Sequence, residues 1–165
     1  MFAKKEKEKH STIDWDTYFL AIVQLISMRS KDPNTKVGSV IVDDLNQVIS
    51  TGYNGMARGV SDKDYSWSND QSNGIENTKY PFVVHSEANA IVSARRDIRG
   101  TKLYTSLFPC NECSKLIIQS GIKEVIYSDN KYKNEVLTIA SKRMLKDAGV
   151  KMIFKDPVKV IVETK

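Results

Sequence analysis

The sequence contains few cysteines, few histidines and no long apolar run. Its 165 residues include two cysteines, Cys110 and Cys113, and because these lie only three positions apart they cannot form the disulfide framework of a small secreted protein. No stretch approaches the roughly 20 apolar residues that cross a bilayer. Residues 1–10 lack the apolar centre of a secretory signal. We therefore expect a cytoplasmic protein in a reducing compartment, without a membrane partner.

The net charge of the chain is modestly positive. A formal charge of +5 favours an anionic partner but does not distinguish a nucleotide from a polynucleotide. Part of the excess lies in residues 4–9, where Glu6 and Glu8 are interleaved with lysines, and we expect a disordered basic tail over residues 1–12. The chain is 41% hydrophobic, which is enough for one domain with a buried core, and its length is short for two. We therefore expect a single domain over residues 13–165.

Hydrophobic periodicity predicts an α/β fold. Apolar residues recur at helical spacing in four segments, namely residues 14–30, 85–96, 110–120 and 137–148. Strand-like runs occupy five others, namely residues 37–42, 47–53, 102–106, 124–127 and 150–154. The first two strands are separated by a turn and predict an antiparallel hairpin, whereas the later strands alternate with helices, as in parallel sheets. We therefore predict a three-layer α/β/α sandwich with a five-stranded mixed sheet.

Residues 57–80 interrupt this alternation. They hold few aliphatic residues and many of Ser, Asp, Asn and Gly, which bury too little apolar surface to form an element of their own. A loop of this length is uncommon in a small domain, so we expect a lid or an insertion around a site.

The residues that carry chemistry lie in two short motifs, His85-Ser86-Glu87 and Pro109-Cys110-Asn111-Glu112-Cys113. His85, Cys110 and Cys113 supply three ligands for a tetrahedral Zn²⁺ and leave the fourth position to water, which is typical of a catalytic site. Both motifs fall at predicted helix starts, where the helix dipole favours thiolate over thiol. The order H-x-E followed by P-C-x-x-C is typical of zinc deaminases that act on cytosine or adenine.

Glu87 is predicted to carry protons. Because residues i and i+2 do not share a helix face, Glu87 is not expected to join His85 as a ligand. It can instead take a proton from the water that attacks C4 of a cytosine, and then protonate the ring nitrogen and the departing ammonia. Two other interpretations exist, because a C-x-x-C pair can be a redox site and a lone His is often structural. The two motifs together favour deamination over either.

Four further motifs accompany the zinc motifs: Arg29-Ser30-Lys31-Asp32-Pro33-Asn34-Thr35, Gly52-Tyr53-Asn54-Gly55, Thr78-Lys79-Tyr80-Pro81 and Leu116-Ile117-Ile118-Gln119-Ser120-Gly121-Ile122. From about residue 13 to 156 the chain resembles the deoxycytidylate (dCMP) deaminases of the cytidine deaminase superfamily. The resemblance implies a cytidine deaminase-like fold and a single zinc-dependent deaminase domain over residues 13–165. It also implies the hydrolysis of dCMP to dUMP and ammonia, which supplies thymidylate synthesis, with one catalytic Zn²⁺ per chain.

The resemblance assigns roles to three residues around the substrate. Asn54 would hydrogen-bond the nucleotide sugar, because its amide both donates and accepts, and Ser86 and Tyr132 would line the substrate site. Other interpretations exist here too, since Asn-Gly sequences favour turns and packing explains a loop aromatic equally well. The chain departs from the family's usual residues at three positions. Ser86 replaces a common Ala, Ala57 replaces a Pro, and Lys36 replaces a common Gln.

The resemblance also implies a regulated oligomer. The family assembles as hexamers and is commonly activated by dCTP and inhibited by dTTP, with Mg²⁺ accompanying the regulatory triphosphate. Lys31, Asp32, Asn34 and Gly55 fall in segments that contact the regulator in the family. A helix stop at Pro33 explains the first three nearly as well.

Two other functions compete with this one. A polynucleotide deaminase that acts on tRNA adenosine or single-stranded DNA cytosine would use the same centre, with the positive charge tracking phosphates. The loop and Asn-Gly motifs argue against it, so we expect a nucleotide and no nucleic acid as partner. A non-catalytic zinc module is the second alternative, but it leaves Glu87 unexplained.

The structural zinc of some relatives is not expected here, because His10, which we expect to be exposed and inert, is the only histidine besides His85.

Overall fold

The computed structural model of the chain describes residues 12–164, so residues 1–11 of the predicted basic tail, His10 among them, lie outside the described part. This part contains four α-helices: α1 (Trp15–Ser27), α2 (Ser86–Ser93), α3 (Asn111–Gln119) and α4 (Val136–Asp147). It also contains the strands β1 (Gly38–Val42), β2 (Val48–Tyr53), β3 (Gly55–Met56), β4 (Val83–Val84), β5 (Lys102–Thr105), β6 (Glu124–Tyr127) and β7 (Lys151–Phe154), and the 3-10 helix η1 (Ile75–Asn77). None of the helices described here has the length and apolar character needed to span a bilayer.

Five of the described strands form one mixed sheet in the order β2-β1-β5-β6-β7. Strand β1 runs antiparallel to both β2 and β5, whereas β5, β6 and β7 are parallel to one another. The predicted hairpin and the predicted parallel second half are therefore confirmed. Because β1 is antiparallel to β5, and β5 is parallel to β6, the amino end of β1 and the carboxyl ends of β5 and β6 lie at the same edge of the sheet, where the loops that carry the site begin.

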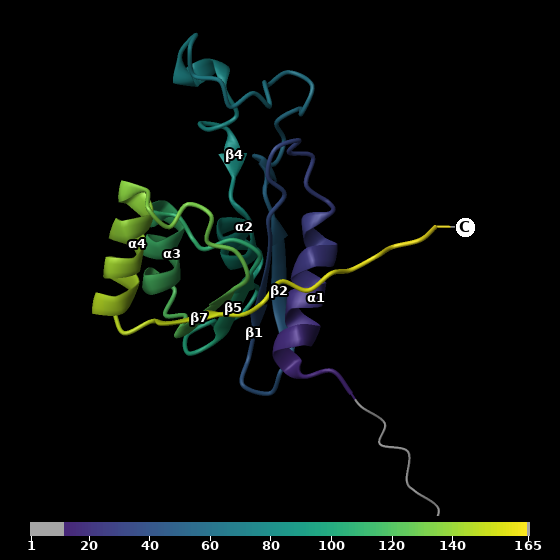
Figure 1. Cartoon of the computed structure of the whole chain (residues 1–165), viewed down its shortest axis with the longest axis vertical. Coiled ribbons are helices and arrows are strands. Elements are labelled where there is room, and N and C mark those ends of the chain that lie inside the picture. Colours follow the sequence, from purple (N-terminus) through teal and green to yellow (C-terminus); the bar gives the residue numbers. More distant parts are fainter. Residues whose placement is uncertain (1–11, 165) are drawn as a thin grey trace, which may run out of the picture.

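Helices cover both faces of the sheet (Figure 1). On one face α1 buries an apolar cluster against the strands, made of Phe19, Leu20, Val23, Val40, Val42, Tyr104 and Ile126. On the other face α2, α3 and α4 cover a second cluster, which includes Ile41, Ala90, Leu103, Ile117, Val125 and Leu145. Every residue of β1 is buried because the strand has helices on both sides. The predicted three-layer α/β/α sandwich is confirmed.

Two helices, α1 and α2, each end three residues earlier than predicted. Helix α1 ends at Ser27, and the Ser30 hydroxyl beyond it donates to the backbone oxygen of Asn54 at 2.8 Å, which draws the chain toward the end of β2. Helix α2 ends at Ser93 because Ala94 adopts an extended backbone conformation. The next fully apolar side chain, that of Ile98, is buried in the core.

The predicted long loop over residues 57–80 is irregular apart from η1 and projects from one end of the sandwich (Figure 1). Its base is closed by a small antiparallel sheet of β3 and β4, which the sequence did not predict, and in which Gly55 pairs with Val84. This pairing places the residue after Asn54 beside the residue before His85. Two segments of the site are thereby held together.

Candidate active site

The three predicted zinc ligands lie together where two helices begin. His85 directly precedes α2, Cys110 directly precedes α3, and Cys113 lies in the first turn of α3. One ligand atom from each residue lies within 4.8 Å of the other two, and residues 12–164 contain no other such group of three. We predicted His85 inside the helix, which is wrong by one position. Its extended backbone caps α2 instead.

The donor set fits Zn²⁺. His85 Nδ1 lies 3.3 Å from Cys110 Sγ and 3.5 Å from Cys113 Sγ, and both thiols are free. Tetrahedral coordination with a Zn–N distance of about 2.0 Å and a Zn–S distance of about 2.3 Å separates such atoms by roughly 3.5 Å. The three side chains can therefore hold a zinc ion and leave one coordination position for another group.

Hydrogen bonds among these ligands shift their pKa values. The pKa of the Cys110 thiol is lowered to about 4, chiefly because its thiolate accepts a hydrogen bond from the Cys113 side chain. The pKa of His85 is raised to about 9, chiefly because its ring donates to Cys110 Sγ. The hydrogen bond between the two cysteine side chains, together with burial, raises the pKa of Cys113. A cation that binds here must therefore displace protons from His85 and Cys113.

Glu87 lies in the first turn of α2, where its side chain is almost fully buried. Burial is the main cause of its raised pKa. A carboxyl group whose pKa is raised holds a proton more readily than an exposed carboxyl group does, and general acid–base catalysis requires a group that both accepts and returns a proton. Glu87 is not part of the ligand group formed by His85 and the two cysteines.

A row of buried hydroxyl groups lies behind Glu87. Ser86 Oγ donates to Glu87 Oε2 at 3.1 Å and lies 2.8 Å from Ser39 Oγ in β1. Ser39 Oγ donates at 3.2 Å to Oγ1 of Thr105, which is the residue opposite Ser39 in β5. All three of these residues are fully buried. The hydroxyl of Ser86, predicted to line the substrate site, therefore faces the sheet, and its backbone is the part left for a ligand.

Asn54, the predicted sugar contact, follows β2 and is buried. Its Oδ1 accepts a hydrogen bond from the backbone N–H of Val37 at 2.8 Å, and its Nδ2 donates to the backbone oxygen of Thr35 at 2.9 Å. A further bond, of 3.3 Å, joins Nδ2 to Asp32 Oδ2. These contacts fix the amide at the amino end of β1. An amide oxygen accepts two hydrogen bonds, so Oδ1 keeps one for a ligand, and the sugar contact stays a prediction.

Comparison with known proteins identifies the family. Residues 13–129 match the family model described as the cytidine and deoxycytidylate deaminase zinc-binding region. The chain belongs to this family. It is 45% identical to mouse deoxycytidylate deaminase over 145 residues, which are 87% of this chain and 81% of that protein. It is 44% identical to the human deoxycytidylate deaminase over the same length and the same shares of the two proteins.

A solved structure from the same family has a similar fold. It is the crystal structure of dCMP deaminase from the cyanophage S-TIM5 in complex with dCMP and dUMP. The TM-score is 0.70 at 27% sequence identity, and the match covers 88% of this chain and 100% of the cyanophage chain. The predicted cytidine deaminase-like fold is therefore confirmed.

The four residues predicted to contact a regulatory nucleotide lie in different surroundings. Asp32 is buried, and its Oδ2 pairs with Lys79 Nζ at 2.6 Å. Lys31 is exposed and pairs with a carboxylate of the long loop, Asn34 lines a cavity, and Gly55 lies in β3. Asp32 thus has a structural role that the sequence pattern did not indicate. The regulatory roles stay predictions.

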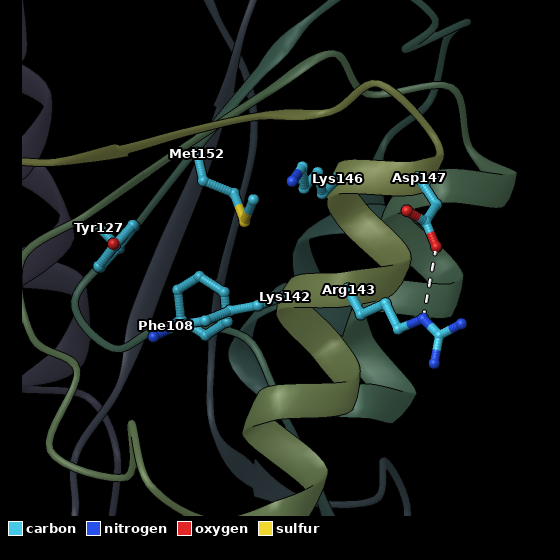
Figure 2. A pocket seen from close by; sticks show the side chains of 7 residues that line it. All are labelled: Phe108, Tyr127, Lys142, Arg143, Lys146, Asp147 and Met152. Atoms are coloured by element: carbon cyan, nitrogen blue, oxygen red, sulfur yellow. Dashed lines mark ion pairs between the residues drawn. The ribbon is translucent and has the colours of Figure 1, made fainter.

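Two cavities flank the segment that leads to the first cysteine ligand. The larger, of about 540 Å³, lies against α4 and is lined by the rings of Phe108 and Tyr127 and by charged residues of that helix (Figure 2). Arg143 pairs there with Asp147 at 3.7 Å, and Figure 2 shows this pair pointing away from the two rings. The smaller, of about 450 Å³, lies at the amino end of β1. It is the one that adjoins the backbone partners of Asn54.

Several site residues were missed by the sequence analysis. Ser39 and Thr105 could have been noticed as polar residues in otherwise apolar strands, whereas nothing marked Lys79 as the partner of a distant carboxylate. Lys131 was also missed, and its ammonium lies 5.0 Å from the ring centroid of Tyr132. The side chain of Tyr132 is exposed, and its predicted place in the substrate site stays a prediction.

Proposed function

We propose that this chain is a zinc-dependent dCMP deaminase, which converts dCMP and water to dUMP and ammonia and so supplies dUMP for thymidylate synthesis. The observation that carries the proposal is the buried carboxyl group of Glu87 beside one imidazole and two thiols at helix N-termini. The mouse and human relatives, which are named deoxycytidylate deaminases, support dCMP as the substrate, as does the similar cyanophage enzyme in complex with dCMP and dUMP.

The residues divide the chemistry between them. His85, Cys110 and Cys113 would hold the metal, and Zn²⁺ bound there supplies a Lewis acid that lowers the pKa of water at its open position. Glu87 accepts one proton from the attacking water and delivers it to N3 of the cytosine ring. It carries the second proton of the water to the 4-amino group, which leaves as ammonia. The water oxygen becomes the C4 carbonyl oxygen of dUMP.

The surroundings of Glu87 favour proton transfer from water. Two thiolates formally cancel the charge of Zn²⁺, so another source of positive potential is needed for water to lose a proton. The N-termini of α2 and α3 supply it, because each carries about half a positive charge. The Ser86 hydroxyl holds one oxygen of Glu87 and leaves the other to exchange protons.

We extend the proposal to binding and regulation. Asn54 contacts the sugar and Tyr132 lines the substrate site in a cytoplasmic hexamer, which dCTP activates and dTTP inhibits, with Mg²⁺ on the regulatory triphosphate. The motifs around Lys31, Asn34 and Gly55 support this extension. Sedimentation of the protein and initial rates with and without each triphosphate test it, and a monomer whose rate ignores both nucleotides contradicts it.

Ammonia release tests the catalytic proposal. Zinc-loaded protein should release ammonia from dCMP, and Glu87→Gln should keep its zinc while losing about 10²- to 10⁴-fold in turnover, because proton transfer is lost. Near-wild-type turnover of zinc-loaded Glu87→Gln would refute the role of Glu87. If ammonia is released from a cytosine-containing oligonucleotide but not from dCMP, the substrate is a polynucleotide and the proposal is wrong.

A further inference from the structure

Helix α4 buries polar side chains where a helix that packs on a core normally buries apolar ones. Its buried residues are Thr138, Ser141 and Leu145, so two of the three are polar. Val136 and Leu137, in its first turn, are 79% and 60% exposed although both are apolar. A buried hydroxyl group is tolerated only where it finds hydrogen-bond partners. The partners of Ser141 therefore indicate why this face of α4 is polar.

Ser141 connects α4 to the segment that carries the first cysteine ligand. Its Oγ donates to the backbone oxygen of Pro109 at 2.8 Å and lies 2.5 Å from Oγ of Ser114 in α3. Because a hydroxyl group has one proton and Ser141 donates its proton to Pro109, the bond between the two serines uses the proton of Ser114. Both serines are fully buried. These bonds therefore join α3 and α4 to the residue that precedes Cys110.

The carbonyl group of Pro109 controls how the chain enters α3. Proline has no backbone N–H, so this carbonyl is the one backbone group of Pro109 that can form a hydrogen bond. One residue earlier, the backbone N–H of Phe108 donates to the backbone oxygen of Asp129 at 2.8 Å. The Pro109 oxygen lies in the same rigid peptide plane as the nitrogen and Cα of Cys110, so the bond from Ser141 fixes the orientation of that plane. This orientation sets the direction in which Cys110 presents its sulfur.

We infer that Ser141 is a positioning residue for the metal centre, and that it holds Cys110 Sγ in place through the carbonyl group of Pro109. The inference rests on the proposed function, because it takes the three predicted ligands as a zinc centre. Groups that orient metal ligands through hydrogen bonds typically contribute about 10- to 100-fold in metal affinity. Ser114 should contribute less, because its contact to Pro109 runs through Ser141.

The zinc affinity of the reduced protein tests the inference without any turnover. Competition with a chelator gives Kd for Zn²⁺, and Ser141→Ala should raise this Kd about 10- to 100-fold. Ser114→Ala is the matched control, because it removes a fully buried hydroxyl group from the same contact and leaves the bond to Pro109 in place. Leu145→Ala is the control for packing, since it shortens a buried side chain on the same face of α4 and leaves both serines in place. Both controls should keep Kd close to that of the wild type.

Two further measurements separate positioning from stability. The midpoint of urea unfolding should fall further in Leu145→Ala than in Ser141→Ala, because losing a buried leucine side chain costs more than losing one hydrogen bond. Co²⁺ bound in place of Zn²⁺ absorbs light at wavelengths that depend on the arrangement of its ligands. The Co²⁺ spectrum of Ser141→Ala should therefore differ from that of the wild type, whereas the spectra of the two controls should not.

Two results would overturn the inference. An unchanged Kd for Zn²⁺ in Ser141→Ala shows that the hydroxyl group does not hold Cys110. Equal weakening of zinc binding in Ser141→Ala and Leu145→Ala shows that the packing of α4, and not the bond to Pro109, holds the centre. Failure of the proposed function is a separate result, namely no ammonia from dCMP with a zinc-loaded wild type whose Kd is still raised by Ser141→Ala.

Discussion

Replacing Lys79 by methionine should destabilise the fold more than the loss of an exposed ion pair does. Lys79 Nζ lies 2.6 Å from Asp32 Oδ2, and the two side chains are 10% and 2% exposed. Lys79→Met preserves the length of the side chain but leaves the Asp32 carboxylate buried without its cation. Breaking a buried pair in this way costs about 3–5 kcal/mol.

The remaining contacts of Asp32 place the cost at the lower end of this range. Its Oδ1 still accepts hydrogen bonds from the backbone N–H groups of Asn34 at 2.8 Å and Thr35 at 3.1 Å. We therefore expect the free energy of unfolding to fall by about 3 kcal/mol. The double variant Lys79→Met, Asp32→Asn buries no charge, so it should be more stable than Lys79→Met alone.

Urea unfolding of the zinc-loaded protein measures these differences, and the midpoint should shift without a change in slope. Lys31→Met is the matched control, because the side chains of the Lys31–Asp62 pair are 67% and 32% exposed and such a pair contributes about 0–1 kcal/mol. Lys79→Met should also raise KM for dCMP, because Asp32 holds the amide of Asn54, the proposed sugar contact. A Lys79→Met protein within about 1 kcal/mol of wild type, the range of an exposed pair, would refute this reasoning.

The metal ligands and the packing of α2 predict three further outcomes. Zinc content after dialysis should fall as the pH drops from about 8 to 5, because protons compete for the ligands and the pKa of His85 is raised to about 9; a constant content contradicts this. Gly52→Ala places a Cβ 2.2 Å from the Ser86 backbone oxygen, so calorimetric unfolding should show a loss of about 1–3 kcal/mol, whereas Gly55→Ala, with its nearest atom at 3.7 Å, should be tolerated. Ser39→Ala should cost about 1 kcal/mol in urea unfolding, and an unchanged midpoint would show that the hydroxyl row does not stabilise the fold.

Features that are set locally could be predicted from the sequence. The periodicity of apolar residues depends on one helix or strand at a time, so it gave the order of the main elements. The spacing of Cys110 and Cys113 likewise reflects one helical turn. Strands of two residues, such as β3 and β4, are too short for any periodicity to appear.

Contacts between distant segments could not be predicted. Lys79 and Asp32 are 47 positions apart, and Ser39 and Thr105 are 66 apart. In a sequence, a lysine or serine that is buried and paired has the same letter as one that is solvated, and most are solvated. The buried polar contacts behind the site therefore became visible only with the fold.

These buried polar groups explain how the site is kept rigid. The Ser39, Ser86 and Thr105 hydroxyl groups and the Asp32–Asn54 contact lie at one edge of the sheet. Well-packed apolar side chains at these positions would often give the fold equal or greater stability. A buried polar group is tolerated only when its hydrogen bonds are made, and each of these bonds requires one orientation. Glu87, the proposed proton carrier, and Asn54, the proposed sugar contact, are thus held in place before a nucleotide binds, which catalysis by positioned groups requires.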